Sequence, residues 1–139
     1  MRIKADPPTD PSDYSFVHDV RVRFAETDAM GIVHHASYLP YLEEARVAYL
    51  RSIDHDYVSV RESGVNFAVI EVAMKYVRAC YFDDVVTVHL RLGARTKATF
   101  QIEYLLTVGA ETRVTAVTAH GCVDGQGRPM RLPKWLSEV

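Results

Sequence analysis

The pattern of apolar and polar positions changes once along the chain, from a helical period to an alternating one. Between residues 37 and 53, apolar residues recur at spacings of three and four, which predicts a helix of roughly four turns with one apolar face. That face carries Tyr38, Tyr41, Leu42, Ala45, Tyr49 and Ile53. After Gly64 the period is two, which predicts strands at residues 67–78, 85–92, 98–106 and 113–123.

A further strand precedes the helix and has Val20, Val22 and Phe24 on one face. One strand, one helix and four strands joined by short turns predict an α+β fold in which a curved antiparallel meander of about five strands wraps around the long central helix. Apolar residues from Val114 to Val123 occupy both faces of the last strand. This distribution favours a further layer of contacts from another subunit, and hence a homo-oligomer.

The sequence also indicates where the helix and the domain begin. Ser37 is a candidate N-cap, and Pro40 is tolerated in the first turn because its missing N–H has no partner there. Residues 1–15, with three prolines among acidic and polar residues, are predicted to form a flexible lead-in. Residues 16–139 are then a single domain.

Composition narrows the function classes. The 139-residue chain has a formal net charge of −2, so nothing favours nucleic acid as a partner. Its N-terminus lacks the apolar core of a signal peptide, and no apolar stretch is long enough to span a membrane. The two cysteines, Cys80 and Cys122, lack the spacing of a metal site. We therefore expect a cytoplasmic protein without a metal.

Asp28 is the main candidate for chemistry. It lies in a loop that contains Gly31, just before the predicted helix. A helix N-terminus offers unpaired N–H groups and a partial positive charge, which can hold an oxyanion while a carboxylate attacks or activates water. The alternative is an acid that only accepts backbone N–H groups in an Asx-turn before Gly31. The residues themselves leave both interpretations open.

The segment Asp28-Ala-Met-Gly31-Ile-Val-His-His35-Ala-Ser-Tyr38, followed by Glu43-Glu-Ala-Arg46, resembles a known signature. It is similar to the 4-hydroxybenzoyl-CoA thioesterase-like branch of the hotdog superfamily, which includes bacterial acyl-CoA thioesterases associated with the Tol–Pal cluster. The resemblance continues through Tyr76, Asp83-Asp84 and residues 125–133, and it covers nearly the whole chain after residue 17. It implies the hotdog fold.

The resemblance also implies a site. Asp28 is then the catalytic carboxylate, acting as nucleophile or general base, and the backbone N–H of His35 polarises the thioester carbonyl. The acyl-CoA or acyl-carrier-protein substrate would lie along the subunit interface, with coenzyme A as part of the substrate and no other cofactor. The implied substrate contacts are Gly31, Ser37 and Tyr38, with Arg95 and Lys97 for the phosphates and Arg128 and Arg131 as weaker candidates. The chain has Ser37 and Ala79 where the family commonly has Asn and Pro.

Several alternatives stay open. Glu43 is a second candidate for the base, although an exposed helix face with Glu43 and Glu44 paired to Arg46 is the commoner arrangement. His34 and His35 are adjacent, so their side chains cannot both point at one site, and no histidine shows zinc spacing. A hotdog dehydratase for hydroxyacyl thioesters and a non-catalytic acyl-thioester-binding protein are the competing functions. The acyl group, the choice between CoA and carrier protein, and the choice between homodimer and homotetramer remain undetermined.

Overall fold

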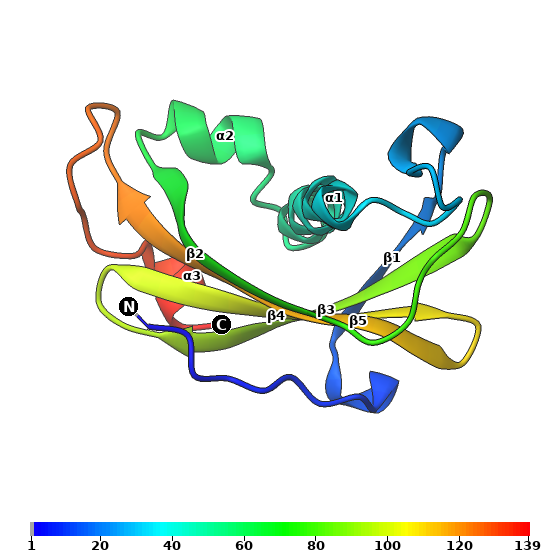
Figure 1. The fold of residues 1–139 in the computed structure, drawn as a ribbon. Helices are drawn as coiled ribbons and strands as arrows, with labels where there is room; N and C mark the ends of the chain where they lie inside the picture. Colours follow the sequence, from blue (N-terminus) through cyan, green and yellow to red (C-terminus); the bar gives the residue numbers. More distant parts are fainter. Residues whose placement is uncertain (1) are drawn as a thin grey trace.

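The computed structural model describes residues 2–139, and within them one antiparallel sheet curves around the long helix α1 (Tyr38–Ser52) (Figure 1). The strands are β1 (Phe16–Arg21), β2 (Asn66–Tyr76), β3 (Val85–Arg95), β4 (Thr99–Val108) and β5 (Glu111–Val123). The expected helix, the four later strands and the wrapped architecture are thereby confirmed. The first strand ends at Arg21, earlier than expected, and Phe24 lies instead in a 3-10 turn that ends at Glu26.

The order of the strands is β1-β3-β4-β5-β2, so the expected meander is correct for β3 to β5 and wrong for β2. β2 pairs with β5 along nearly its whole length, and β1 pairs with β3. α1 follows β1 and crosses the concave face, which carries the chain from one edge of the sheet to the other. Residues 77–84 then return past the end of the sheet, where the N–H groups of Val77 and Arg78 donate to the carbonyl of Arg113.

The apolar face of α1 fills the concave side of the sheet. Its buried residues are Tyr38, Tyr41, Leu42, Ala45 and Tyr49, and they belong to one core with inward-facing residues of β3, β4 and β5. Removing such side chains from water stabilises the fold by about 1.5–3 kcal/mol for each large residue. This packing fixes the start of α1 relative to the sheet, and the candidate site lies there.

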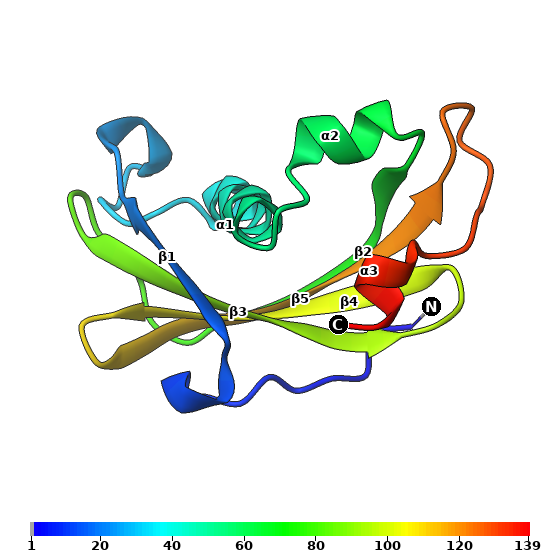
Figure 2. The ribbon, with the colours of Figure 1, turned by 180° about the vertical axis from the view of Figure 1, so that it is seen from behind.

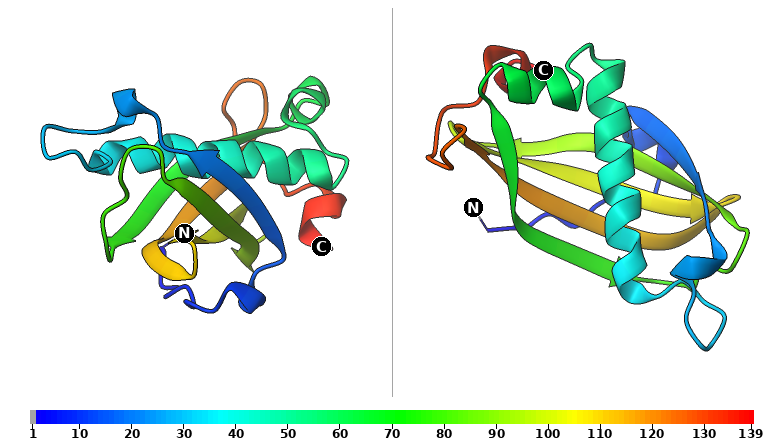
Figure 3. Two further views of the ribbon diagram at one scale, coloured as in Figure 1. Left: turned by 90° about the vertical axis from the view of Figure 1, so that its right-hand side faces the viewer. Right: turned by 90° about the horizontal axis from the view of Figure 1, so that it is seen from above.

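Two short helices were not predicted from the sequence. α2 (Tyr57–Glu62) and α3 (Lys134–Ser137) lie near the C-terminal end of α1, far from the loop that precedes α1 (Figure 3). α2 is only six residues long, which is too short for a helical period to appear in the sequence. The carboxylate of Asp56 caps it by accepting the N–H of Ser59.

The N-terminal segment lies across the outer, convex face of the sheet (Figure 2). The ring of Tyr14 is buried beside His89, with the guanidinium of Arg91 over it at 5.4 Å from the ring centroid. The N–H of Ile3 donates to Glu71 at 3.0 Å. The second layer expected from another subunit is therefore supplied in part by the chain's own N-terminus. The flexibility of residues 1–15 stays a prediction, and Met1 lies outside the described residues.

β2 forms one edge of the sheet and exposes apolar side chains. Val69, Ile70 and Val72 are 52%, 48% and 41% exposed. An edge strand with unpaired backbone groups and exposed apolar residues is a surface on which another chain can pair. Within residues 2–139, no helix is long and apolar enough to cross a membrane.

Candidate functional site

The loop that carries Asp28 is a small hairpin leading into α1. The N–H of His34 donates to the carbonyl of Glu26 at 2.9 Å, and the N–H of Asp28 donates to the carbonyl of Ile32 at 2.8 Å. At its tip the N–H of Gly31 donates to the carbonyl of Asp28, closing a turn. Gly31 has φ = +81°, a conformation that side-chain-bearing residues rarely adopt, so the turn favours glycine there.

The half-buried carboxylate of Asp28 uses only one of its oxygens within the fold. Oδ1 accepts the N–H of Met30 at 2.8 Å, which is the Asx-turn expected from the sequence. Oδ2 accepts no hydrogen bond from any residue between 2 and 139. The Asx-turn therefore orients the carboxylate and leaves its second oxygen available for chemistry, so the two interpretations of Asp28 are compatible.

The chain enters α1 through a 3-10 turn, His35–Ser37, and the capping differs from expectation. The side chain of His34 accepts the N–H of Ala36 at 3.2 Å, and Ser37 has helical backbone angles without a side-chain cap. The prediction that Ser37 caps the helix is therefore wrong, because the extra turn moves the first unpaired N–H groups upstream. The N–H of His35 has no acceptor in the described part of the chain, whereas its carbonyl accepts the hydroxyl of Tyr76 at 3.2 Å.

A partly buried acid that the sequence analysis did not single out ties this hairpin to α1. Glu26 accepts hydrogen bonds from the hydroxyl of Tyr41 at 2.7 Å and from the N–H of Arg23 at 2.8 Å, and it forms an ion pair with the side chain of Arg23. Burial raises the pKa of Glu26, but these hydrogen bonds outweigh it and hold the pKa below its usual value. Burial and the neighbouring carboxylate raise the pKa of Tyr41. Glu26 therefore stays ionised and anchors the hairpin.

Tyr38 lies in the core behind the hairpin. Only 2% of it is exposed, and its hydroxyl accepts the N–H of Cys80 at 3.4 Å. Burial raises its pKa, which keeps the hydroxyl protonated. Substrate contact by Tyr38, as by Gly31 and Ser37, stays a prediction.

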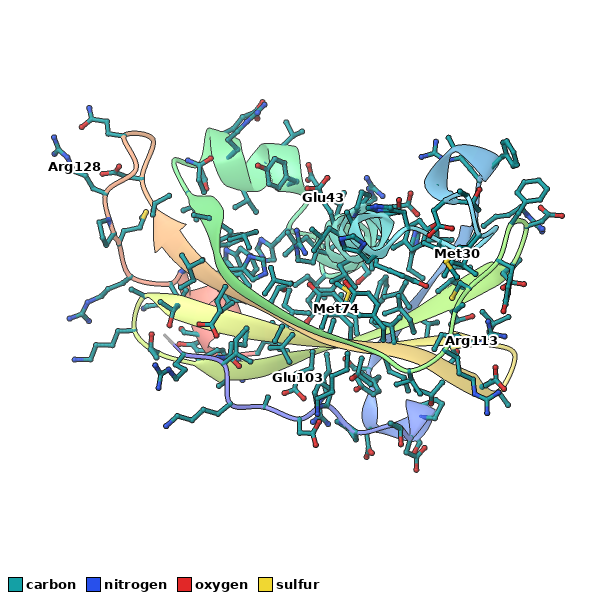
Figure 4. All side chains as sticks on the ribbon, in the orientation of Figure 1. Met30, Glu43, Met74, Glu103, Arg113 and Arg128 are labelled. Carbon is teal, nitrogen blue, oxygen red and sulfur yellow. The ribbon has the colours of Figure 1, made fainter. Side chains whose placement is uncertain are left out.

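Two cavities follow α1 on the side of β2. The larger, of about 280 Å³, lies among α1, β2, β4 and α3, and a second, of about 250 Å³, lies nearer the start of α1. Glu43, Arg46 and Val69 border both cavities. Figure 4 shows Glu43 on the side of α1 that faces α2, with Met30 on the opposite side. The cavities are thus separated from the hairpin of the same chain.

The charged residues of α1 do not pair as expected. Arg46 donates to the hydroxyl of Tyr104 at 3.2 Å, and Glu44 bonds His18 at 2.6 Å. Neither glutamate forms an ion pair with Arg46 in the part of the chain that is described. The expected pairing along the helix is therefore wrong, because Arg46 and Glu44 each bond a side chain of the sheet instead. Glu43 is left at the cavity.

The basic residues expected to bind phosphate lie at the other end of the molecule. Arg95 donates to the backbone carbonyls of Leu136 and Val139 at 2.9 and 2.6 Å, so it holds the C-terminal segment. Lys97 is exposed, and so are Arg128 and Arg131, with Arg128 at the tip of the loop after β5 (Figure 4). Within one chain, none of the four contacts the hairpin. Phosphate binding by these residues stays a prediction.

The described residues contain no cluster of three or more histidine, cysteine or acidic side chains arranged to hold a metal ion. Cys80 and Cys122 are both free and buried. Burial raises the pKa of each thiol. These cysteines therefore act as small apolar residues of the core.

Comparison with known proteins gives the family. Residues 22–139 match the model of the thioesterase-like superfamily. The acyl-CoA thioesterase YbgC of Haemophilus influenzae is 33% identical, with 88% of this chain and 91% of that protein covered. The 1,4-dihydroxy-2-naphthoyl-CoA hydrolase of Synechococcus elongatus is 30% identical, with 90% and 96% covered.

A solved structure agrees with this assignment. The crystal structure of a hypothetical protein from Aquifex aeolicus superposes with a TM-score of 0.85 at 35% identity, covering 89% of this chain and 98% of that one. The resemblance to hotdog thioesterases and the enzyme class expected from it are confirmed. This chain belongs to the thioesterase-like superfamily. It has the hotdog fold and is a thioester hydrolase.

Proposed function

We propose that this enzyme hydrolyses an acyl thioester of CoA or of a carrier protein, with Asp28 as the catalytic carboxylate. One observation carries the proposal. The hairpin that leads into α1 presents two groups without a partner among residues 2–139: Oδ2 of the oriented Asp28 carboxylate and the backbone N–H of His35. An acyl transfer needs both, a group that attacks or activates water and a donor for the developing oxyanion.

The chemistry follows from these two groups. The thioester carbonyl oxygen accepts the N–H of His35 at the positive end of α1, which stabilises the negative charge formed on that oxygen. Asp28 either attacks the carbonyl carbon, expelling the thiolate and leaving an anhydride that water cleaves, or takes a proton from the attacking water. In both routes water is the second substrate, and the products are a carboxylic acid and a free thiol. Neither route needs a cofactor.

We also propose a homodimer formed through β2. A two-fold axis across this edge would join two sheets into one and place both α1 helices on the same face, running in opposite directions. The exposed apolar side chains of Val69, Ile70 and Val72 would be covered. The cavities beside β2 would then lie at the subunit interface, close to a second copy of the chain. Packing of such dimers into a homotetramer and a cytoplasmic location stay predictions.

The names of the relatives support the substrate class. One relative is named as an acyl-CoA thioesterase and another as a hydrolase of an aromatic acyl-CoA. The dehydratase alternative pairs a histidine with a carboxylate across the dimer, and no such pairing is apparent on α1, which contains no histidine. The acyl-binding alternative has no use for a free carboxylate oxygen at a helix N-terminus.

The test is thiol release from short, long and aromatic acyl-CoAs and from the matching acyl-carrier proteins. We expect hydrolysis of at least one class by the wild type, and we expect Glu43→Gln to retain it. Binding without hydrolysis of every thioester would overturn the proposal in favour of the acyl-binding protein. After a single turnover in isotopically labelled water, label in Asp28 identifies the anhydride route, with attack of water on the Asp28 carboxyl carbon.

A further inference from the structure

The larger cavity ends on a line of four hydrogen-bonded side chains that the proposed reaction does not use. Arg46 donates to the hydroxyl of Tyr104 at 3.2 Å, this hydroxyl bonds Oγ1 of Thr118 at 2.7 Å, and Oγ1 bonds Nε2 of His120 at 2.7 Å. Tyr104, Thr118 and His120 are each no more than 2% exposed. In a buried network each donor needs an acceptor. The position of each proton therefore constrains the position of the next one along the line.

Counting donors and acceptors among these four side chains indicates one direction for this line of hydrogen bonds. A guanidinium has only donors, so the oxygen of Tyr104 accepts from Arg46 and its own proton goes to Thr118. The proton of Thr118 then goes to Nε2 of His120, because no other acceptor contacts that hydroxyl in residues 2–139. A neutral imidazole that accepts at Nε2 carries its proton on Nδ1. His120 therefore presents an Nδ1–H donor.

Three further observations describe that donor. Burial, with a contribution from Arg46, lowers the pKa of His120 to about 3, so the ring is neutral under ordinary conditions. The ring stacks on Phe100, with centroids 4.9 Å apart, which holds its orientation. His120 borders the cavity, and its Nδ1 has no hydrogen-bond partner anywhere in the described chain. An unpaired N–H on a cavity wall is available to a ligand or water that accepts its proton.

The remainder of the cavity suits an apolar body. Its walls include Tyr49, Phe67, Leu92, Phe100, Ile102 and Leu136. Its other polar groups are Arg46, which has no carboxylate partner among the described residues, the exposed Glu43, and the hydroxyls of Tyr49 and Tyr57. Of the buried groups at this cavity, Nδ1–H of His120 is a donor, and the hydroxyl of Tyr49 can donate or accept. The complement of the cavity is an apolar group that carries an oxygen acceptor.

We propose that this cavity receives the distal part of the acyl group and that the Nδ1–H of His120 selects acyl groups bearing an oxygen acceptor over plain hydrocarbon ones. The inference names the substrate class of the proposed thioesterase. It also rests on the proposed β2 dimer, because the cavity is separated from Asp28 of its own chain and would receive an acyl group bound at the hairpin of the second copy. His120 is then a specificity-determining residue, oriented through Thr118 and Tyr104 by Arg46. Selectivity of this kind is strong, because a site built to bond an oxygen leaves its donor unpaired with the unsubstituted analogue.

His89 offers a matched comparison on the opposite face of the same sheet. It is also buried, it bonds Thr107 at 3.0 Å, and its Nδ1 is also unpaired. However, His89 lies beside Tyr14 under the N-terminal segment and borders neither cavity beside α1. Replacing His89 therefore removes a similar buried imidazole without touching the proposed acyl-binding cavity.

The first test is the tautomer of His120 in the free wild-type protein, read from the nitrogen chemical shifts of its ring by NMR. We expect the neutral form with the proton on Nδ1 between pH 5 and pH 8. A proton on Nε2, or a charged ring in this range, would overturn the inference. This measurement needs neither a substrate nor a variant.

The second test compares kcat/KM for acyl-CoAs that differ by one oxygen. The pairs are 4-hydroxybenzoyl-CoA against benzoyl-CoA, and octanoyl-CoA with a terminal hydroxyl against octanoyl-CoA. We expect the wild type to prefer the oxygenated member of one pair by about tenfold to a hundredfold. His120→Phe should bring that ratio close to one, and His89→Phe should leave it unchanged. A wild-type ratio near one in both pairs would contradict the proposal.

Binding measurements distinguish failure of the thioesterase proposal from failure of the proposal about His120. Thioether analogues of the same four compounds cannot be hydrolysed, and their dissociation constants give the same ratios without turnover. Absence of hydrolysis with an intact binding preference would reject catalysis and retain the role of His120. Hydrolysis with no preference in either assay would retain catalysis and reject the role of His120. Because the decisive ratios come from the wild type, a variant that fails to fold does not decide the outcome.

Discussion

The hydroxyl of Tyr41 donates a hydrogen bond to the carboxylate of Glu26 at 2.7 Å. Tyr41 lies in the first turns of α1, and Glu26 lies at the base of the hairpin that carries Asp28. The bond therefore fixes this hairpin against the helix whose entry presents the N–H of His35. In an enzyme that depends on positioning, such a tie affects stability and rate together.

Tyr41→Phe removes this tie and keeps the ring. We expect the free energy of unfolding to fall by about 1–2 kcal/mol, since Glu26 stays partly buried with one donor fewer, and kcat to fall by about tenfold. Chemical denaturation and thiol release measure the two effects. Tyr49→Phe is the control for stability, because the hydroxyl of this buried tyrosine makes no hydrogen bond within residues 2–139. An equal loss of unfolding free energy in both variants would show that the Tyr41–Glu26 bond has no special role.

Glu26 also predicts how stability depends on pH. Despite its burial, the hydrogen bonds from Arg23 and Tyr41 hold its pKa in the folded protein below the usual 4.5. A group with a depressed folded pKa stabilises the fold above the unfolded pKa, and this contribution is lost as the pH falls through the folded value. The difference in unfolding free energy between wild type and Glu26→Gln should therefore be largest near neutral pH and shrink below pH 4.5. A constant difference from pH 7 to pH 3 would contradict this.

The sequence predicts what is local in this structure. The period of α1, the alternation of β2 to β5 and the turn from Asp28 to Gly31 are each encoded within a few residues. The position of β2 is not, since its alternation fits beside either β3 or β5. The Tyr41–Glu26 bond and the path from Arg46 to His120 join residues that are distant in sequence, and neither pattern nor motif signals them. Helix capping at Ser37 was mispredicted because a 3-10 turn extends the helix entry upstream.

Gly31 should be replaceable only at a cost. Its φ of +81° disfavours any side chain, although no atom lies within 4 Å of the site of a Cβ. We expect Gly31→Ala to destabilise the protein by about 1 kcal/mol through backbone strain alone. Gly125→Ala is the matched substitution, because Gly125 has equally open surroundings and no positive φ. Thermal unfolding of the two variants compares them, and an equal melting temperature would refute the strain argument.

The β2 edge gives a prediction about assembly. Val72→Lys places a charge on the exposed edge proposed to pair with a second copy, and sedimentation velocity should then show a shift toward monomer. Val17→Lys places the same charge on β1, the opposite edge, where Val17 is 56% exposed. We expect this variant to sediment as the wild type does. The reverse result would move the interface to β1.

The central claim is that the free oxygen of Asp28 performs the reaction, and Asp28→Asn tests it most directly. Asparagine keeps the shape and can still accept the N–H of Met30 through its amide oxygen, so the turn and the melting temperature should be preserved. We expect kcat for the best acyl-CoA to fall by at least about a thousandfold, as removal of a nucleophile or general base does. An unchanged kcat in a variant with an unchanged melting temperature would contradict the account and direct attention to Glu43.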